Sequence, residues 1–168
     1  QASTPQYALD YVLKKNNINC EVEYFATHAE LATQALSGNA DIILIPEPQV
    51  STILSKNADF RIAVDFNAAW DEATENKALF SMGCLAIRKD FAEKNPQAVE
   101  KFLEEYASSV KFVNENVEEG AKLIAENKIV ANVNIAQKAI PNAKMVTISG
   151  DEMKKKKKTY LQILFESD

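Results

Sequence analysis

The sequence contains few of the residues on which several classes of functional site depend. Its 168 residues include only two cysteines and one histidine. Two cysteines without CxxC spacing form neither a disulfide framework nor a zinc knuckle, so we interpret Cys20 and Cys84 as small buried thiols, with a bridge between them as the alternative. His28 alone cannot supply a multi-histidine metal site or a histidine-based triad. We therefore expect no metal, no cofactor and no catalytic residue.

A basic charge balance and a long apolar run are also missing. The formal net charge is −5 and the isoelectric point is about 5.1, which leaves no basic surface for nucleic acid. The five consecutive lysines at 154–158 would point in all directions on a helix, which indicates a solvated segment, with attraction to a membrane surface as the alternative. No stretch approaches the roughly 20 apolar residues that span a bilayer. We expect no nucleic-acid partner and no membrane crossing in these residues.

Hydrophobic periodicity in the first half alternates between helix and strand patterns. Thr4-Pro5 predicts a helix with Thr4 as N-cap, the capping box Thr27–Glu30 predicts a second helix, and Pro48 opens a third. Strands are predicted at residues 20–25, 40–45 and 60–66, of which the second (ADIILI) is apolar on both faces. The alternation predicts an α/β fold, a mainly parallel sheet flanked by helices.

The second half is predicted to be mainly helical. A polar loop over residues 67–81 precedes one more strand at residues 84–88. Asn95-Pro96 then caps a long helix with apolar residues at helical spacing, and three further helices begin near Asn116, Ile135 and Ser149. We place a domain boundary near residues 82–83. In a parallel α/β unit each helix follows a strand, but the first element predicted here is a helix. We therefore expect the natural chain to extend upstream and to contain the missing strand.

Three stretches, in this order, resemble the solute-binding proteins of nitrate, sulfonate, taurine and thiamine-precursor importers. They are residues 1–5 (QASTP), 40–48 (ADIILIPEP) and 82–91 (MGCLAIRKDF), and the resemblance continues through Asn95-Pro96 to the final helix. It implies a periplasmic-binding-protein-like type 2 fold, with the ligand held between two α/β lobes. Residues 1–82 would form the second, C-terminal lobe without its first strand. Residues 83–168 would form a crossing strand and helices that return towards the first lobe.

The resemblance implies a solute-binding component of an ABC importer and not an enzyme. Such a protein is an extracytoplasmic monomer, tethered by an N-terminal lipid anchor outside this chain, that delivers a small polar ligand to a permease and an ATPase. One alternative is a ligand-binding sensory or effector module. Another is an enzyme similar to the pyrimidine synthases of thiamine biosynthesis. Those enzymes have a cysteine-rich motif and active-site histidines, whereas this chain contains only Cys20, Cys84 and His28.

The first candidate ligand-binding residues lie where helices begin. Ser3, Thr4 and Pro5 open the first predicted helix, where unpaired backbone N–H groups favour a sulfonate, nitrate or carboxylate; simple capping by Thr4 is the alternative. Glu47 and Pro48 follow a buried strand, where open α/β sheets bind ligands. Glu47 would accept hydrogen bonds from an amine or ring N–H, and its alternative role is a carboxylate at the start of the next helix.

The remaining candidates lie at the end of a strand and at the proposed domain crossing. Asp65 ends the strand at 60–66, and Met82-Gly83 lies where glycine lets the backbone bend or approach a ligand, with a structural role as the alternative. We interpret Trp70 as a packing or lid residue. A helix start and Glu47 in one cleft predict a small zwitterionic or polar heterocyclic ligand, such as an amino-sulfonate or a pyrimidine.

Overall fold

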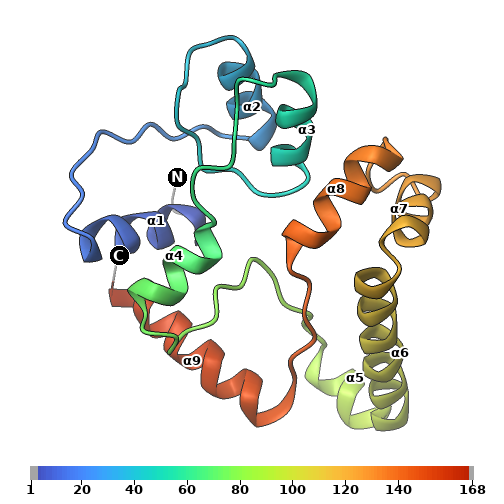
Figure 1. Ribbon diagram of the computed structural model, residues 1–168. Helices are drawn as coiled ribbons and strands as arrows, with labels where there is room; N and C mark the ends of the chain where they lie inside the picture. The colour runs from blue at the N-terminus through green and yellow to red at the C-terminus, as the bar shows by residue number, and fades with distance from the viewer. Residues whose placement is uncertain (1–3, 167–168) are drawn as a thin grey trace. The chain divides into compact units, whose positions relative to one another are not determined.

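The computed structural model describes residues 4–166, which form helices joined by irregular segments (Figure 1). The helices of these residues are α1 (Thr4–Lys15), α2 (His28–Leu36), α3 (Gln49–Lys56), α4 (Phe66–Ala73), α5 (Lys89–Lys94), α6 (Pro96–Glu115), α7 (Val117–Glu126), α8 (Val133–Ala143) and α9 (Gly150–Glu166). No helix of the described residues is long and apolar enough to cross a bilayer.

The predicted parallel sheet is absent from the described residues. Residues 20–25, 40–45, 60–65 and 84–88 run without helix or strand pairing, and α4 already begins at Phe66. The prediction of an α/β fold class is therefore wrong. Alternating apolar residues indicate a segment with two faces, whereas a strand also needs a neighbour that supplies the ladder hydrogen bonds. Local sequence does not determine that neighbour.

Local signals predicted several helix starts correctly. The helix α1 begins at Thr4, and α3 begins directly after Pro48. At the start of α2 the predicted capping box forms, because the Glu30 backbone N–H donates to Thr27 Oγ1 at 3.1 Å and the Ala26 N–H donates to the Glu30 carboxylate at 3.3 Å. Both bonds satisfy backbone donors that a helix start leaves unpaired.

Two helices were not predicted from the sequence. Most of α4 lies in residues 67–81, which the sequence predicted as a polar loop, and α5 is a helix of six residues. The Asp65 side chain starts α4 by accepting from the Asn67 backbone N–H at 3.0 Å. Neither segment shows a clear apolar period, and α4 is not preceded by a proline as α3, also of eight residues, is.

The chain divides into two compact units, and each is described by itself. Unit 1 consists of Gln1–Leu31, Arg61–Cys84 and Ile148–Asp168, and unit 2 consists of Ala32–Phe60 and Leu85–Thr147. The division passes through α2. The two lobes predicted from the sequence, residues 1–82 and 83–168, stay a prediction.

The core of unit 1 is built around Trp70. Its side chain is fully buried, and its ring centroid lies 5.5 Å from Tyr11, 5.5 Å from Phe80 and 5.6 Å from Tyr160. The indole N–H donates to the Ala78 carbonyl at 2.8 Å, so the only polar atom of the side chain is satisfied. Trp70 thus has a packing role and ties α4 to α1 and α9.

One hydrophobic cluster of unit 2 lies mainly between α7 and α8. Its buried residues are Ala121, Ala136 and Ile140. The Asn132 side chain caps α8 by accepting from the backbone N–H groups of residues 134 and 135, at 2.8 and 3.4 Å. Gly120 lets α7 approach α6 closely, because a Cβ at this position would lie 3.2 Å from a methyl group of Val113.

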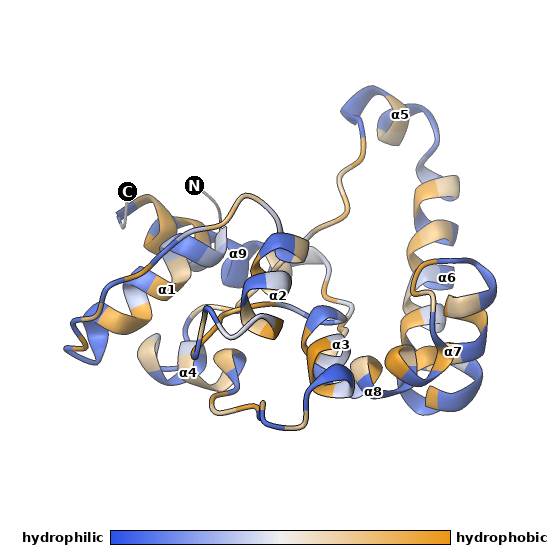
Figure 2. Ribbon diagram, turned by 90° about the horizontal axis from the view of Figure 1, so that it is seen from above, coloured by the Kyte–Doolittle hydropathy of each residue, from blue (hydrophilic) through white to orange (hydrophobic). Residues whose placement is uncertain are grey.

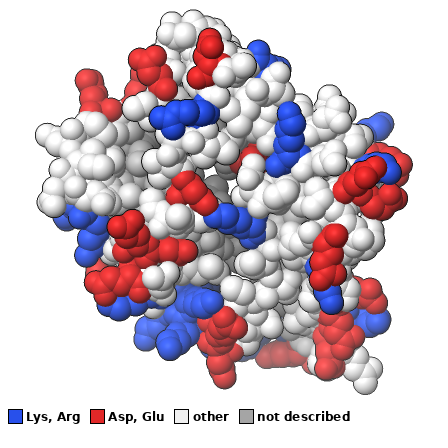
Figure 3. All heavy atoms as spheres, viewed as in Figure 1, with Lys and Arg blue, Asp and Glu red and all other residues white. Residues whose placement is uncertain are grey.

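The two cysteines and the charged residues lie on the surface. Cys20 and Cys84 are both free and exposed, so their interpretation as buried thiols is wrong. The reason is that both lie in irregular segments that no helix covers. On the face seen in Figure 3, acidic and basic side chains are interspersed and are not gathered by sign.

Candidate functional site

Unit 1 brings the start of α1 together with residues 81–84 through a tyrosine of α9. The Tyr160 hydroxyl donates to the Ser81 carbonyl oxygen at 3.1 Å. The Thr4 hydroxyl forms a hydrogen bond with the Tyr160 side chain. Because a tyrosine hydroxyl has one proton and that proton goes to Ser81, Thr4 is the donor in the second bond. Thr4, Pro5 and Met82-Gly83 therefore belong to one region of the molecule.

A lysine of α9 lies in the same region. The Lys157 ammonium donates to Cys84 Sγ at 3.2 Å, and Lys157 is half-buried. Lys157 and Tyr160 are three residues apart, which places them on one face of α9. We call Thr4, Ser81, Cys84, Lys157 and Tyr160 the Tyr160 cluster.

The electrostatics of the Tyr160 cluster favour a negatively charged group. The N-terminus of α1 contributes a partial positive charge and Lys157 a full one. Burial raises the pKa of the Tyr160 hydroxyl above its ordinary value of 10.0, while the hydrogen bond from Thr4 acts in the opposite direction. Tyr160 thus remains a neutral hydroxyl at physiological pH. The cluster can bind an oxyanion through the Lys157 ammonium group, because the hydroxyl protons of Tyr160 and Thr4 already go to Ser81 and Tyr160.

The backbone next to the cluster is open. Met82 is exposed, and a Cβ at Gly83 would meet no atom within 4 Å. The Ser81 hydroxyl donates to the Gly83 carbonyl at 2.9 Å, which fixes the turn of the chain there. A ligand can therefore approach this segment without displacing a side chain. Among the described residues no group of acidic, histidine and cysteine side chains could hold a metal ion.

The candidates in unit 2 lie at the start of α3. Glu47 Oε2 accepts from the Ser51 backbone N–H at 3.0 Å, and Oε1 accepts from Ser51 Oγ at 3.0 Å and from Asn142 Nδ2 at 3.1 Å. These contacts are those of a carboxylate at a helix start, with Asn142 adding a link to α8. A ligand-binding role for Glu47 and Pro48 stays a prediction.

The remaining predicted residues have structural contacts or lie outside the description. Asp65 caps α4, and Pro5 lies in the first turn of α1. Ser3 lies outside the described residues. A ligand-binding role for these residues stays a prediction.

Sequence reasoning missed Tyr160, Lys157 and Ser81. Lys157 belongs to the five-lysine run, which was interpreted as a solvated segment, and Tyr160 follows that run in the same helix. One signal was available, because a tyrosine on an apolar helix face needs a partner for its hydroxyl. The partner itself, 79 residues away, could not be inferred from that signal.

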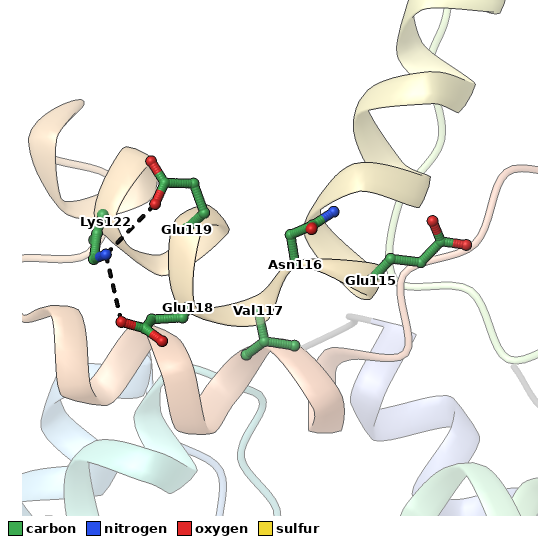
Figure 4. Close-up of a pocket in the computed structure, with 6 residues that line it drawn as sticks. All are labelled: Glu115, Asn116, Val117, Glu118, Glu119 and Lys122. Carbon is green, nitrogen blue, oxygen red and sulfur yellow. Dashed lines mark hydrogen bonds and ion pairs between the residues drawn. The ribbon is translucent and has the colours of Figure 1, made fainter.

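Two surface hollows of the described residues lie elsewhere. One of about 380 Å³ lies where α6 meets α7. Figure 4 shows its Lys122 paired with both Glu118 and Glu119, at 3.4 and 3.5 Å, so the lysine charge of this hollow already has two partners. A second hollow, of about 300 Å³ in unit 1, is lined by Tyr11 and Lys15 among others. Neither is lined by a member of the Tyr160 cluster.

A family match covers most of the sequence. Residues 1–146 match the family described as "Menaquinone biosynthesis". The chain belongs to the menaquinone biosynthesis family. This overturns the prediction that the chain is not an enzyme, because the family is defined by a biosynthetic role. Thr4, Ser81 and Cys84 lie within the part that matches the menaquinone biosynthesis family, whereas Lys157 and Tyr160 follow it.

A solved structure is similar to this member of the menaquinone biosynthesis family. It is the crystal structure of an ABC transporter from Parabacteroides distasonis, with 22% identity and a TM-score of 0.78, covering 98% of this chain and 56% of that chain. The present chain thus spans little more than half of that protein. At this identity the likeness shows the fold alone, and to that extent it supports the resemblance to importer proteins. No curated protein sequence matches the chain.

Proposed function

We propose that this chain is the part of a menaquinone-biosynthesis enzyme that binds a small organic anion at the Tyr160 cluster. The family match over residues 1–146 supports a biosynthetic role. The observation that carries the proposal is that Tyr160 joins Thr4 at the start of α1 to Ser81, while Lys157, three residues before Tyr160 in α9, contacts Cys84. A carboxylate is the favoured group, because a helix N-terminus and an ammonium group both stabilise it.

Each residue of the cluster has a distinct part in the proposed binding. Lys157 supplies charge, and its present partner is the Cys84 sulfur, a weak acceptor. Tyr160 and Thr4 use their hydroxyl protons in bonds to Ser81 and Tyr160, so they hold α1, α9 and residue 81 together before a ligand arrives. This preorganisation lowers the entropy that binding must overcome.

The test is calorimetry of the longest natural polypeptide that contains the chain, with aliphatic and aromatic carboxylates as probes and taurine, alkylsulfonates and nitrate for comparison. Lys157→Gln should weaken carboxylate binding about tenfold or more, the loss of one charge-assisted contact. Lys154→Gln is the matched control, since Lys154 lies in the same helix and its side chain is 82% exposed. Equal affinity of both variants would contradict the proposed site.

A second candidate function is solute binding for an ABC importer, favoured by the likeness to the Parabacteroides protein. Under this candidate the partners are a permease and an ATPase, and the protein acts outside the cytoplasm on a lipid anchor. Mass spectrometry after incubation separates the two functions. Conversion of the bound compound supports the enzyme, whereas its unchanged recovery with tight binding supports the importer component.

A further inference from the structure

Two nucleophilic side chains of unit 1, the Cys84 thiol and the Lys157 amine, are in direct contact. Lys157 Nζ lies 3.2 Å from Cys84 Sγ, although the two residues are 73 positions apart in the sequence. Cys84 is exposed and Lys157 is half-buried. Cys84 and Cys20, the two cysteines of the chain, are both free, so no disulfide uses either sulfur. A reagent in solvent can therefore reach Cys84 while the lysine nitrogen is beside it.

A second bond links the same two segments of the chain. The Tyr160 hydroxyl donates to the Ser81 carbonyl at 3.1 Å. Tyr160 follows Lys157 by three residues in α9, and Ser81 itself precedes the cysteine by three residues. The Ser81 hydroxyl also donates to the carbonyl of Gly83, directly before Cys84, at 2.9 Å. The sulfur and the nitrogen are thus positioned before any reaction, which lowers the entropy cost of joining them.

Lys157 differs from two other members of the lysine run because no carboxylate holds its nitrogen. Lys154 pairs with Asp151 at 3.8 Å. Lys156 pairs with Glu152 at 2.9 Å. The positions three and four residues to either side of Lys157 carry no acidic side chain, and within residues 4–166 it forms no ion pair. Figure 2 shows the lysine run as a hydrophilic part of α9, ahead of a more apolar end. The Cys84 sulfur is therefore the partner that this nitrogen has.

We propose that Cys84 and Lys157 are the site of an oxidative cross-link, a sulfenamide bond between Sγ and Nζ that forms when the protein meets a peroxide. In the first step the Cys84 thiolate attacks one peroxide oxygen and the O–O bond breaks. Cys84 becomes a sulfenic acid, and the second oxygen leaves as water or an alcohol. The sulfur is oxidised by two electrons, and the peroxide is reduced by the same two.

The second step is a condensation without further change of electron count. Lys157 gives its ammonium proton to solvent and attacks the sulfenic sulfur with the nitrogen lone pair. The S–N bond forms, the S–O bond breaks, and the hydroxyl takes the remaining proton and leaves as water. Sulfenic acids condense with a backbone nitrogen in the same way. A thiol reductant reverses the cross-link by attacking the sulfur, which releases the lysine amine.

The cross-link also switches off the anion site, and this consequence rests on the proposed function. Lys157 is the ammonium group of the Tyr160 cluster, and a sulfenamide nitrogen has no positive charge. Carboxylate binding should therefore weaken about tenfold or more after treatment with peroxide, and it should return with a thiol reductant.

The test is hydrogen peroxide treatment of the longest natural polypeptide that contains the chain, followed by mass spectrometry of its peptides. Cleavage after glutamate separates residues 76–93, which contain Cys84, from residues 153–166, which contain Lys157. After oxidation these two peptides should appear as one joined peptide, lighter than their sum by the mass of two hydrogen atoms. Fragmentation should place the bond at Lys157, and a thiol reductant should release both peptides unchanged.

Cys20 and Lys154→Gln are the matched controls. Cys20 is exposed as Cys84 is, but its sulfur has no hydrogen bond to a nitrogen in the described structure, so it should proceed to the sulfinic acid. Lys157→Gln should abolish the joined peptide and leave Cys84 to the same fate, whereas Lys154→Gln should keep the cross-link. Circular dichroism establishes that each variant is folded.

Two results would overturn the inference. One is oxidation of Cys84 and Cys20 to the same acids in the parent protein, without a joined peptide. The other is a joined peptide that persists in Lys157→Gln, because the bond would then involve another lysine. The masses are read without a ligand, so they decide the cross-link independently of carboxylate binding. A cross-link in a protein that binds no carboxylate would contradict only the proposed function.

Discussion

The two units of the molecule differ in the size of the side chains that they bury. In unit 1, aromatic rings from α1, α4, α9 and the segment before residue 81 surround Trp70, which is fully buried. In unit 2, the buried residues of the α7–α8 core are two alanines and one isoleucine, while the large side chains of α6 stay exposed. Since the free energy of burial scales with the apolar area removed from water, Trp70 contributes more to unit 1 than any one of these three residues contributes to unit 2.

The comparison teaches where function is to be sought in each unit. In unit 1 the strong core holds the Tyr160 ring, so the hydroxyl on its edge has a fixed position beside Thr4 and Ser81. This rigidity suits a site that recognises a small ligand. In unit 2 the stacked rings of Phe102 and Tyr106 on α6 are 52% and 37% exposed, and neighbouring exposed apolar side chains are the feature by which interaction sites are recognised.

The largest effect is expected from Trp70→Ala. Removal of a fully buried indole and of its hydrogen bond to Ala78 should lower the free energy of unfolding by about 3–5 kcal/mol. Urea denaturation followed by circular dichroism measures this loss. Phe165→Ala is the control, since Phe165 is 83% exposed and the change should stay within about 0.5 kcal/mol.

Amide exchange of Trp70→Ala also tests whether the units differ as described. Exchange should accelerate in α1, α4 and α9 and change little in α7 and α8, because the substitution weakens only the core of unit 1. Equal acceleration in all five helices would show that the units unfold together. The contrast between two separately stabilised cores would then be wrong.

An intermediate effect is expected from Gly120→Ala in unit 2. The added Cβ would lie 3.2 Å from Val113 Cγ1 and 3.3 Å from its Cα, and the backbone atom cannot move aside as a side chain does. We expect a loss of about 1–3 kcal/mol from this crowding, which exceeds the roughly 0.5–1 kcal/mol that alanine gains over glycine in a helix. Thermal denaturation measures the net change.

Gly83→Ala is the matched control for Gly120→Ala. A Cβ at Gly83 meets nothing within 4 Å, so its stability should stay within about 0.5 kcal/mol of the parent protein. A stabilised Gly120→Ala variant would show that α6 and α7 separate easily. That result would place α6 outside the core of unit 2 altogether.

The sequence predicted what depends on neighbouring residues and failed where the partner is distant. The capping box Thr27–Glu30 spans three residues and was predicted correctly. Trp70 was placed in a polar loop because the residues that bury it, Tyr11, Phe80 and Tyr160, come from three other segments. The strands failed for the same reason, since a ladder needs a partner that local alternation does not name.

The candidate site shows the same division. Thr4 was a candidate because Ser-Thr-Pro is a local helix-start pattern. Its hydrogen-bond partner Tyr160 lies more than 150 residues further along the chain, so no spacing rule connects the two. For Glu47, by contrast, the position before α3 predicted two roles, ligand binding and a carboxylate at the helix start. The contacts with Ser51 are those of a carboxylate at a helix start.

The smallest effect at neutral pH is expected from Tyr160→Phe. The substitution keeps the ring in the core and removes only the hydroxyl that bonds to Ser81 and Thr4, so the free energy of unfolding should fall by about 1 kcal/mol. Tyr106→Phe is the control, because Tyr106 is exposed in α6 and its hydroxyl has no hydrogen bond in the described structure.

The alkaline range makes the Tyr160→Phe comparison sharper. The pKa of Tyr160 in the folded chain is raised above 10.0, chiefly by burial, so folding favours the neutral hydroxyl. The resulting stability is complete below pH 10 and is lost as the pH rises through the folded-state pKa, because the unfolded chain releases its proton first. The parent protein should therefore lose stability more steeply above pH 10 than Tyr160→Phe. Parallel curves would mean that the Tyr160 hydroxyl is not buried beside Ser81, and the Tyr160 cluster would lose the bond that joins α9 to residue 81.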